Sequence, residues 1–581
     1  MRLETESQIE LNSGELILAF EKTRERWVLN VQGDGYPLLV SNSLALLTPV
    51  LDGEPAALTL DAVETSGPSG VTLRFIGEAV EQLVLKVSVS PGYGAIDLDC
   101  EFIPRRDGQL NRLTLFPTGT KVSAYDLVNF RNRHFTPHTW PELNLGQAFE
   151  TDTYSGDWMF APHPSLFIFR KLEVNLFAGL FEVPYGTFGM HLSVERNVVR
   201  HWFLDYGTAP NGLALKAGET FRSPKLRLFA HSGKTVYDML DAFSGMLIHA
   251  GQTPDPAKKR RPAWWTEPLY CTWGDQVAKS RSVPAVELQE QSLKPDFIPG
   301  SMLNEAFIRE AAALILREKL PIRTILIDEG WSVARGQWET HPKRFPNLRG
   351  LVDDLHRQGF KVVVWLAWTE IFDDACVPSE FLVGGGQWLN RHGRRFTDYS
   401  SPHTQKEYLA PLMRQLFSAE PGCYDLDGLK TDFQADKIHP EMPLADPAWR
   451  GEENFLCRMT KLLSQEMKLH KPDAMHLGCA GHFWLAPWID VNRTYDVFSN
   501  NYLEHEQRCI MLRHTAPGCP VSYDIHISLE NLDGWFASAR RCGASVEIGN
   551  LSYVGDTWGG GGLADECYYN RLRTALGNKT T

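Results

Sequence analysis

The stretch "FPNLRGLVDDLHRQGFKVVVWLAW", residues 345–368, joins the two patterns that decide the fold. Its first part has apolar residues at the spacing of an amphipathic helix, and its second part contains the apolar run Val362–Ala367. A short run that is apolar throughout is typical of a parallel strand buried on both faces. The stretch therefore predicts a surface helix followed by a buried parallel strand.

This alternation continues through the chain from residue 265 onward. Amphipathic patterns such as "NEAFIREAAALILREKL" separate the apolar runs, and "CPVSY" at 519–523 adds one more strand. The pattern gives about eight strands, which predicts a (β/α)8 TIM barrel, with a doubly wound open sheet as the alternative. The other apolar runs are 269–273, 322–327, 362–367, 426–429, 475–477, 495–499 and 545–548.

The first part of the chain has a different texture. Stretches such as "GELILAFEKTRERWVLNVQG" (14–33) alternate apolar and polar residues between glycine, proline and asparagine turns, as antiparallel strands do. An all-β supersandwich is therefore expected before the barrel. A helical pattern and a proline-rich linker follow it, so the predicted domains are a β-sandwich (1–235), a helix with linker (236–264) and the barrel (265–581).

Composition narrows the function classes. The formal net charge of −13 argues against nucleic-acid and anionic-membrane partners, which need a basic surface. The opening "MRLETESQIE" has no apolar signal region and no run is long enough to span a bilayer, so a cytoplasmic protein is expected. The ten cysteines form no CxxC pair and are scattered, which favours buried thiols over disulfides, and no metal or other cofactor is expected.

Carboxylates and tryptophans gather after the predicted strands. In a TIM barrel the chemistry lies at the carboxyl ends of the strands, and tryptophan faces with carboxylates suit a sugar. Each residue also has a structural interpretation: a helix cap for an aspartate, an ion pair for Lys430 with Asp432, a core position for a tryptophan, a packed thiol for Cys479. In strand order the residues are Trp273; Asp328, Glu329 and Trp331; Trp365, Trp368 and Glu370; Lys430 and Asp432; Cys479 and His482; Arg493 and Asp496; Asp524 and His526.

Four stretches in this order resemble the α-galactosidase (melibiase) superfamily. They are "TILIDEGW" (324–331), the stretch at 345–368, "DGLKTDFQAD" (427–436) and "DVNRTYDVFSN" (490–500). This superfamily of retaining α-glycosidases includes α-galactosidases, α-N-acetylgalactosaminidases and raffinose-synthase-like transglycosidases. The resemblance implies a retaining glycoside hydrolase with an N-terminal β-supersandwich before its barrel.

The resemblance also implies roles for individual residues. Asp432 is the expected nucleophile, which forms a covalent glycosyl-aspartate with Lys430 beside it, and Asp496 is the expected acid/base, with Asp490 as the second choice. Arg493 and the pair Asp328-Glu329 are expected to contact sugar hydroxyls, although many α-galactosidases have Asp-Asp where this chain has Asp-Glu. The remaining expected substrate contacts are Trp273, Trp331, Trp365, Trp368, Glu370, Cys479 and His482.

Four functions remain open. The first is a retaining α-glycoside hydrolase acting on an α-galactoside-like oligosaccharide or glycoconjugate, and the second is a transglycosidase built from the same residues. The third is a barrel enzyme that uses Asp328, Glu370 and Asp432 to hold a divalent cation. The fourth is a carbohydrate-binding protein without activity, because Asn500 stands where some members of the superfamily have an aspartate. An oligomer is compatible with all four.

Overall fold

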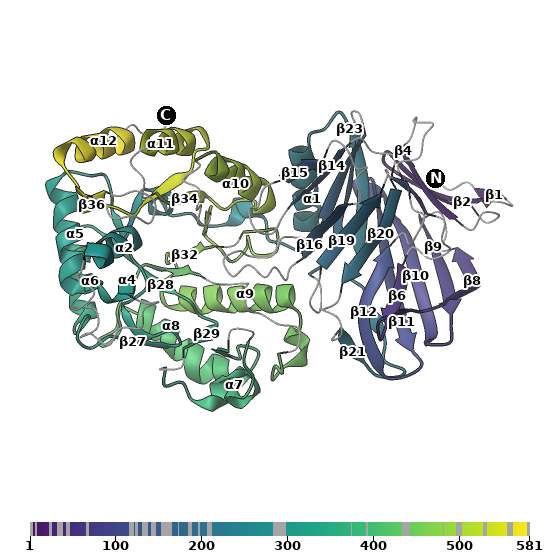
Figure 1. Cartoon of the computed structure of the whole chain (residues 1–581), viewed down its shortest axis with the longest axis horizontal. Helices are drawn as coiled ribbons and strands as arrows, with labels where there is room; N and C mark the ends of the chain where they lie inside the picture. The colour runs from purple at the N-terminus through teal and green to yellow at the C-terminus, as the bar shows by residue number, and fades with distance from the viewer. Residues whose placement is uncertain are drawn as a thin grey trace.

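The computed structural model describes most of the chain and places its two parts side by side (Figure 1). The β-rich part carries the N-terminus, and the part that carries the C-terminus is a ring of helices around a closed barrel. The predicted fold class, an all-β region followed by a TIM barrel, is confirmed. The described residues are 4–5, 8–21, 26–31, 39–41, 47–65, 69–115, 121–122, 126–130, 137–140, 147–152, 166–171, 174–183, 189–195, 198–205, 212–282, 298–372, 375–390, 393–432, 442–479, 481–494, 502–526, 531–554 and 562–577.

Two antiparallel sheets form the N-terminal part. The first sheet runs β1 (Glu4–Thr5), β2 (Gln8–Ser13), β3 (Leu16–Glu21), β4 (Arg26–Val31), β5 (Leu39–Ser41), β13 (Lys121–Val122), β20 (Val198–Asp205), β12 (Gly108–Leu115), β6 (Leu47–Leu51) and β7 (Glu54–Pro55), joined by β16 (Gln147–Asp152), β19 (Gly189–Glu195) and β21 (Leu213–Leu215). The second runs β15 (Pro137–Trp140), β14 (Asp126–Phe130), β17 (Leu166–Lys171), β18 (Val174–Leu180), β23 (Leu226–Ser232), β11 (Ala95–Pro104), β10 (Val80–Ser90), β9 (Gly70–Ile76) and β8 (Thr59–Thr65), joined by β22 (Phe221–Arg222).

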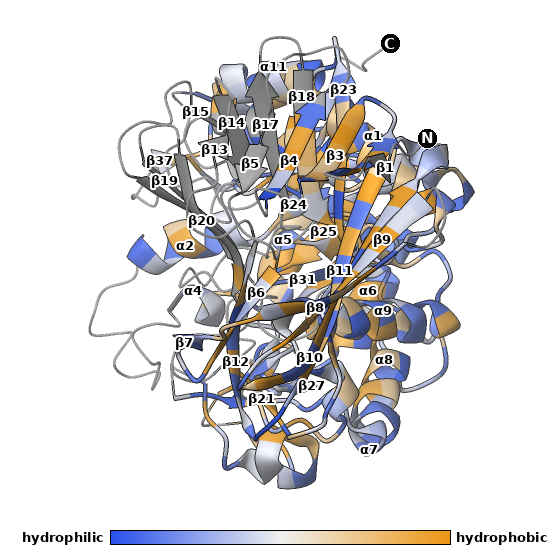
Figure 2. Cartoon of the chain, turned by 90° about the vertical axis from the view of Figure 1, so that its right-hand side faces the viewer, coloured by the Kyte–Doolittle hydropathy of each residue, from blue (hydrophilic) through white to orange (hydrophobic). Residues whose placement is uncertain are grey.

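The alternating sequence pattern explains how these sheets pack. Leu85 on β10 lies opposite Leu73 on β9, and Leu83 lies opposite Phe75, so apolar side chains pair across the strands on one face. All four are fully buried, because residues two apart on a strand share a face. Figure 2 shows the alternation as bands of hydrophobic and hydrophilic residues along the strands. The hydrophobic bands form the core between the sheets.

Eight parallel strands close the barrel. Its order follows the sequence, so the barrel, and not the open sheet, is the observed topology. The predicted sixth strand, residues 495–499, lies outside the described residues, and the sixth barrel strand is instead Val491–Arg493. The strands are β24 (Leu269–Cys271), β25 (Thr324–Ile327), β28 (Lys361–Leu366), β31 (Gly428–Thr431), β32 (Met475–Gly478), β33 (Val491–Arg493), β34 (Val521–His526) and β35 (Ser545–Ile548).

Helices cover the outside of the barrel (Figure 1). Asn304 and Asn347 cap two of them by accepting backbone N–H bonds, which explains where these helices begin. No helix in the described ranges is both long and apolar enough to cross a membrane. The helices are α1 (Val236–His249), α2 (Trp273–Ser282), α4 (Ile298–Ser301), α5 (Glu305–Arg317), α6 (Leu348–Arg357), α7 (Pro402–Thr404), α8 (Ala410–Phe417), α9 (Glu452–His470), α10 (Tyr502–Thr515), α11 (Leu532–Arg541) and α12 (Glu566–Gly577). Two hairpin strands, β26 (Ser332–Ala334) and β27 (Gln337–Thr340), follow β25.

An aromatic cluster joins the two parts. Helix α1 packs between them, and its Phe243 contacts Phe177 of the second sheet and Phe483 of the loop after β32. The next residue, Trp484, is only 4% exposed and belongs to the core of the N-terminal sheets. The hydroxyl of Thr253 in the linker donates to the carbonyl of Phe483 at 3.1 Å. The loop after β32 is therefore held by the β-rich part of the chain.

Replacing Trp484 by alanine should measure how much its packing against the N-terminal sheets stabilises the protein. Removing a buried tryptophan from a packed core costs about 3–5 kcal/mol, so Trp484→Ala should lower the free energy of unfolding by that amount in urea titrations. Leu469→Ala is the control, because Leu469 is 72% exposed and its loss should change the unfolding free energy by less than about 0.5 kcal/mol. Equal stability of the two variants would show that Trp484 does not anchor the loop.

Candidate active site

The inner face of the barrel changes from apolar to polar towards the carboxyl ends of its strands. Leu326 on β25 belongs to an apolar cluster inside the barrel, and Asp328 follows two residues later. Leu477 is likewise followed by Cys479, and Val491 by Arg493. Because residues two apart point the same way, each strand that carries such a pair delivers one apolar and one polar group to the interior. The polar groups meet at the mouth of the barrel.

Lys430 and its two carboxylates form the centre of this mouth. Its Nζ lies 2.8 Å from Asp328 Oδ2 and 3.9 Å from Asp432 Oδ2. Burial lowers the pKa of Lys430 and Arg493 lowers it further, but Asp328 and Asp432 outweigh both and hold it well above its ordinary value. The indole N–H of Trp365 donates to the same Oδ2 of Asp432 at 2.9 Å. Asp432 is therefore oriented by one hydrogen bond and one ion pair, and its side chain is 23% exposed, against 5% for Lys430.

Thr431 between these two residues faces the outside of the barrel. Its hydroxyl pairs with His476 Nε2 at 2.9 Å, and His476 Nδ1 pairs with the carbonyl oxygen of Trp488. Burial lowers the pKa of His476 to about 4, so the ring is neutral and donates from Nδ1. Its Nε2 then accepts from Thr431. This bond holds β31 against β32, so Lys430 and Asp432 on either side of Thr431 point into the barrel.

Arg335 is the second cation of the mouth, and it pairs with two carboxylates there. Its Nε and Nη2 donate to the two oxygens of Glu329 at 2.5 and 3.0 Å, and its Nη1 lies 3.4 Å from Glu370. The guanidinium also lies 5.2 Å from the centre of the Trp365 ring. Burial raises the pKa of Glu329, and Arg335 opposes the rise. Sequence reasoning missed Arg335, although a basic residue in the hairpin that follows "TILIDEGW" was the available signal.

Arg493 is the third cation of the mouth. Arg493 Nε donates to Glu547 at 2.9 Å, Nη2 pairs with Asp524, and Nη1 donates to Cys479 Sγ at 2.7 Å. With a residue exposure of 2%, Arg493 supports the mouth through these three contacts, and its expected contact with sugar hydroxyls stays a prediction. Glu547 was also missed; its signal was an acidic residue inside the apolar strand "SVEI".

Several predicted contacts lie behind the mouth. Trp331 and Trp368 are fully enclosed, so they are not stacking platforms for a sugar; the indole N–H of Trp331 instead donates to the carbonyl of Trp365 at 2.8 Å. His482 is buried against Glu453 of α9 at 2.7 Å, which removes it from the substrate. Trp273 begins α2 and packs against the apolar cluster inside the barrel.

The two acid/base choices have different outcomes. Asp496 lies outside the described residues, so its role stays a prediction. Asp490 precedes β33 at the amino end of the strand, where it pairs with Lys468 at 2.8 Å and Lys259 at 3.6 Å. The mouth lies at the opposite end of this strand, beyond Arg493. Asp490 is therefore a structural residue.

The predicted cation ligands do not gather into one set. Asp328 pairs with Lys430, and Glu370 pairs with Arg335. Within the ranges that the structure describes, no group of three acidic, histidine or cysteine side chains is arranged to hold a metal ion. The carboxylates of the mouth are instead arranged around basic side chains.

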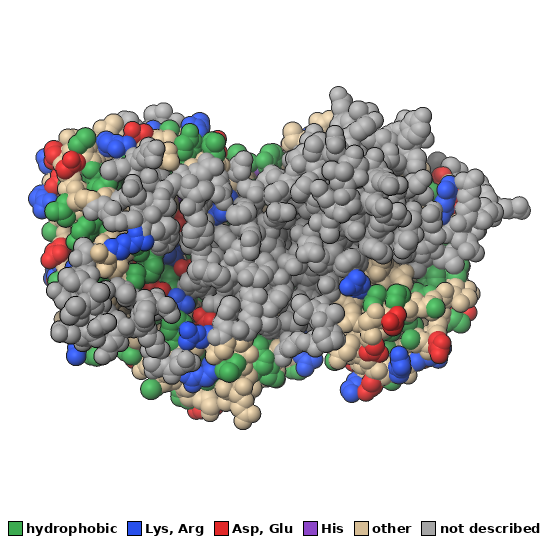
Figure 3. Space-filling view, in the orientation of Figure 1, with side chains coloured by type: hydrophobic (Ala, Val, Ile, Leu, Met, Phe, Trp, Pro, Cys, Tyr) green, Lys and Arg blue, Asp and Glu red, His purple; other side chains and the backbone are tan. Residues whose placement is uncertain are grey.

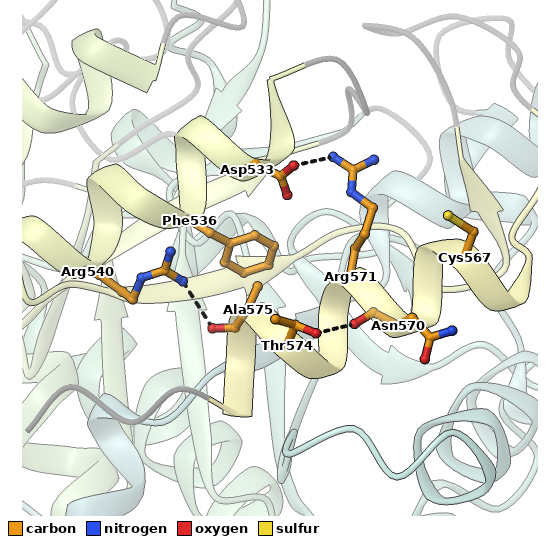
Figure 4. Close-up of a pocket in the computed structure, with 8 residues that line it drawn as sticks. All are labelled: Asp533, Phe536, Arg540, Cys567, Asn570, Arg571, Thr574 and Ala575. Atoms are coloured by element: carbon orange, nitrogen blue, oxygen red, sulfur yellow. Dashed lines mark hydrogen bonds and ion pairs between the residues drawn. The ribbon is translucent and has the colours of Figure 1, made fainter.

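Three surface cavities lie away from this mouth. Figure 4 shows one of about 630 Å³ between α11 and α12, where Asp533 pairs with Arg571 and Arg540 donates to the carbonyl of Ala575. Two further cavities, each of about 510 Å³, adjoin Arg323 and Tyr408. On the face drawn in Figure 3, acidic and basic side chains lie interspersed over the described surface of the barrel. The cluster of acidic and basic side chains at the barrel mouth, and not these cavities, is therefore the candidate active site.

Comparisons with known proteins identify the type of barrel. Residues 300–518 match the family model described as "Glycosyl hydrolases family 31 TIM-barrel domain". The barrel is thus of the glycoside hydrolase type. No curated protein sequence matches the chain.

Solved structures share the fold of nearly the whole chain. The α-N-acetylgalactosaminidase NagBb from Bifidobacterium bifidum, in complex with GalNAc, has a TM-score of 0.65 at 12% identity, covering 99% of this chain and 92% of that one. The α-galactosidase from Lactobacillus brevis has a TM-score of 0.59 at 14% identity, with 98% and 83% covered. The GH36 α-galactosidase AgaA from Geobacillus stearothermophilus, in complex with stachyose, has a TM-score of 0.60 at 11% identity, with 98% and 85% covered.

The pair of Arg335 with Glu329 can be tested by unfolding. Arg335→Ala leaves a buried carboxylate without its cation, so the free energy of unfolding should fall by about 3–5 kcal/mol. Adding Glu329→Gln should recover part of the loss, because the uncompensated charge is removed. The control is Arg74→Ala, because Arg74 and its partner Glu64 are substantially exposed, and it should cost less than about 1 kcal/mol. Identical stability of Arg335→Ala and the native chain would disprove the pair.

Proposed function

We propose that the chain is a retaining α-glycoside hydrolase that acts on an α-galactoside-like oligosaccharide or glycoconjugate. The observation that carries the proposal is the position of Asp432. This carboxylate lies at the carboxyl end of the fourth barrel strand, is oriented by Lys430 and Trp365, and is partly exposed in a barrel of the glycoside hydrolase type. Such a group suits a nucleophile.

Asp432 would attack the anomeric carbon and form an ester bond as the glycosidic bond breaks. Lys430 supports this step because its positive charge lies 3.9 Å from the carboxylate that attacks. The departing oxygen needs a proton, which Asp496 is proposed to give. Water then cleaves the ester, with Asp496 taking the proton of the water back.

The charge balance of the mouth also supports a glycosidase. Three cations serve six carboxylates there: Lys430 pairs with Asp328 and Asp432, Arg335 with Glu329 and Glu370, and Arg493 with Asp524 and Glu547. Even with Glu547 protonated, this set has five carboxylates against three cations, which is an excess of two negative charges. An excess of negative charge stabilises the positive charge that develops on the sugar ring in the transition state.

The structure also suggests how the sugar is selected. Arg335 engages both oxygens of Glu329, so the acidic pair offers one acidic side chain, Asp328, and one guanidinium to the hydroxyls. The α-galactoside preference is proposed from the sequence resemblance, in line with the α-galactosidases and the α-N-acetylgalactosaminidase that share the fold. The bonded Arg335 distinguishes this chain from a site with two free carboxylates.

The direct test is a panel of p-nitrophenyl α- and β-glycosides, with the anomer of the first product read by NMR. The purified chain should cleave an α-glycoside with retention. Asp432→Asn should lower kcat by at least about 10⁴-fold, because the covalent step is lost. Asp533→Asn is the control, since Asp533 is an exposed residue of α11 that lies away from the mouth. Inversion, or an active Asp432→Asn variant, would overturn the proposal.

The same assay separates the alternatives. If added sugar acceptors divert most of the product from hydrolysis to transfer, the chain is a transglycosidase built on the same nucleophile. If sugars bind but no glycoside is cleaved, it is a binding protein.

The acid/base assignment makes its own prediction. Asp496→Ala should slow substrates with poor leaving groups by about 10²–10⁴-fold and slow p-nitrophenyl glycosides much less, because a good leaving group needs little protonation. The measurement is kcat/KM for both substrate classes. Asp490→Asn should show no such difference between the classes, because Asp490 lies at the other end of strand β33. Equal losses for both classes with Asp496→Ala would remove Asp496 from the role.

A further inference from the structure

Glu547 closes the network around Arg493 from the last barrel strand. One of its oxygens, Oε1, accepts from Arg493 Nε at 2.9 Å, and the side chain is fully buried. The other, Oε2, has no hydrogen-bond partner among the described residues. A buried carboxylate with one bonded and one unbonded oxygen is arranged to carry a proton on the unbonded oxygen. Protonation there leaves the bond from Arg493 intact.

The charged groups around Glu547 come from three other strands. Arg493 lies on β33 and Asp524 on β34, while Lys430 lies on β31. Burial raises the pKa of Glu547 to about 7; Arg493 opposes the rise and Asp524 adds to it. The thiol of Cys271 on β24 is also within electrostatic range of Glu547. One guanidinium is thus shared by two carboxylates when Glu547 is ionised.

Thr494, the residue after Arg493, is held by hydrogen bonds of its backbone and its side chain. Thr494 N–H donates to the carbonyl of Ser522 at 3.0 Å, and its hydroxyl pairs with His505 Nδ1 at 2.7 Å. Arg508 Nη1 donates to the Thr494 carbonyl at 2.9 Å. The exit of the sixth strand is therefore fixed by its neighbours in the barrel and by α10. Two residues further along the chain comes Asp496.

We propose that Glu547 is a positioning residue that holds Arg493 against Asp524, and that the gain or loss of one proton on its Oε2 tunes the reaction. The proposal rests on the proposed function, because it acts on the same site. When the proton leaves Oε2 for the solvent, the mouth gains a buried negative charge. An ionised Glu547 draws the shared guanidinium of Arg493 away from Asp524, so the support of the mouth weakens and turnover falls as Glu547 ionises.

Two variants separate the position of Glu547 from its charge. Glu547→Gln keeps an oxygen for Arg493 Nε and mimics the protonated acid, so at pH 5.5 its kcat should lie within about threefold of the native enzyme. Glu547→Ala removes the acceptor, so its kcat should fall at least about 10-fold while KM stays within about twofold. Equal kcat values for the two variants would overturn the positioning role.

The proton is tested by the ratio of native to Glu547→Gln kcat across pH. The ratio cancels ionisations that both enzymes share, and it should be constant below pH 6 and fall at least about threefold by pH 8, with a midpoint near 7. Asp97→Asn is the matched control, since Asp97 is another buried carboxylate bonded to an arginine, Arg227, in the N-terminal sheets. The ratio of native to Asp97→Asn kcat should stay constant. A flat ratio for Glu547→Gln would overturn the proposal.

Thermal unfolding tests the same proton without activity. The folded chain keeps the Glu547 proton to a higher pH than the unfolded chain does, so this group's contribution to stability is lost as the pH rises from about 4.5 to 7. The Tm of the native chain should therefore fall relative to that of Glu547→Gln over this window. A chain that cleaves no glycoside but shows this Tm difference retains the proton site and loses the proposed function. A chain that cleaves glycosides but whose Tm difference does not change with pH retains the proposed function and lacks the proton site.

Discussion

The buried ammonium group of Lys430 is the interaction on which the barrel mouth depends. A lone charge in a protein interior is costly, and it is tolerated only with charge partners and hydrogen bonds. Asp328 and Asp432 supply these from two different strands, so the ion pairs also fix the relative positions of β25 and β31. The same arrangement occurs around Arg335 and around Arg493, each with two carboxylates. The mouth is thus built from three such units.

Much of this was predictable from the sequence because it follows from periodicity. Buried parallel strands are apolar on both faces, and the runs between amphipathic helices therefore reveal the barrel. Lys430 and Asp432 are two residues apart at a strand end, so they share the inner face of the barrel. Asp328 follows a strand of the same type, and the three meet as the pattern predicts. Here local spacing and tertiary position carry the same information.

Other features depend on contacts that spacing does not encode. The sixth strand is short and includes Asn492 and Arg493, so its apolar signal is lost although all three of its residues are buried. Arg335 reaches the mouth from a hairpin, and its partner Glu329 is recognisable only once that hairpin folds back. His482 follows a barrel strand as a ligand-binding residue would, but α9 supplies Glu453 as its partner. In each case the deciding partner is distant in sequence.

Among the described residues, the loop after β32 links the N-terminal sheets to the mouth. Cys479, which contacts Arg493, follows β32, and within five residues the same loop inserts Trp484 into the core of the sheets. His482 is fixed between them by Glu453, so the loop is held at both ends and in the middle. The position of Cys479, and with it one of the three contacts of Arg493, therefore depends on packing outside the barrel. The β-rich part acts as a support for the fifth and sixth strand ends, which is a structural reason for the two parts to form a single unit.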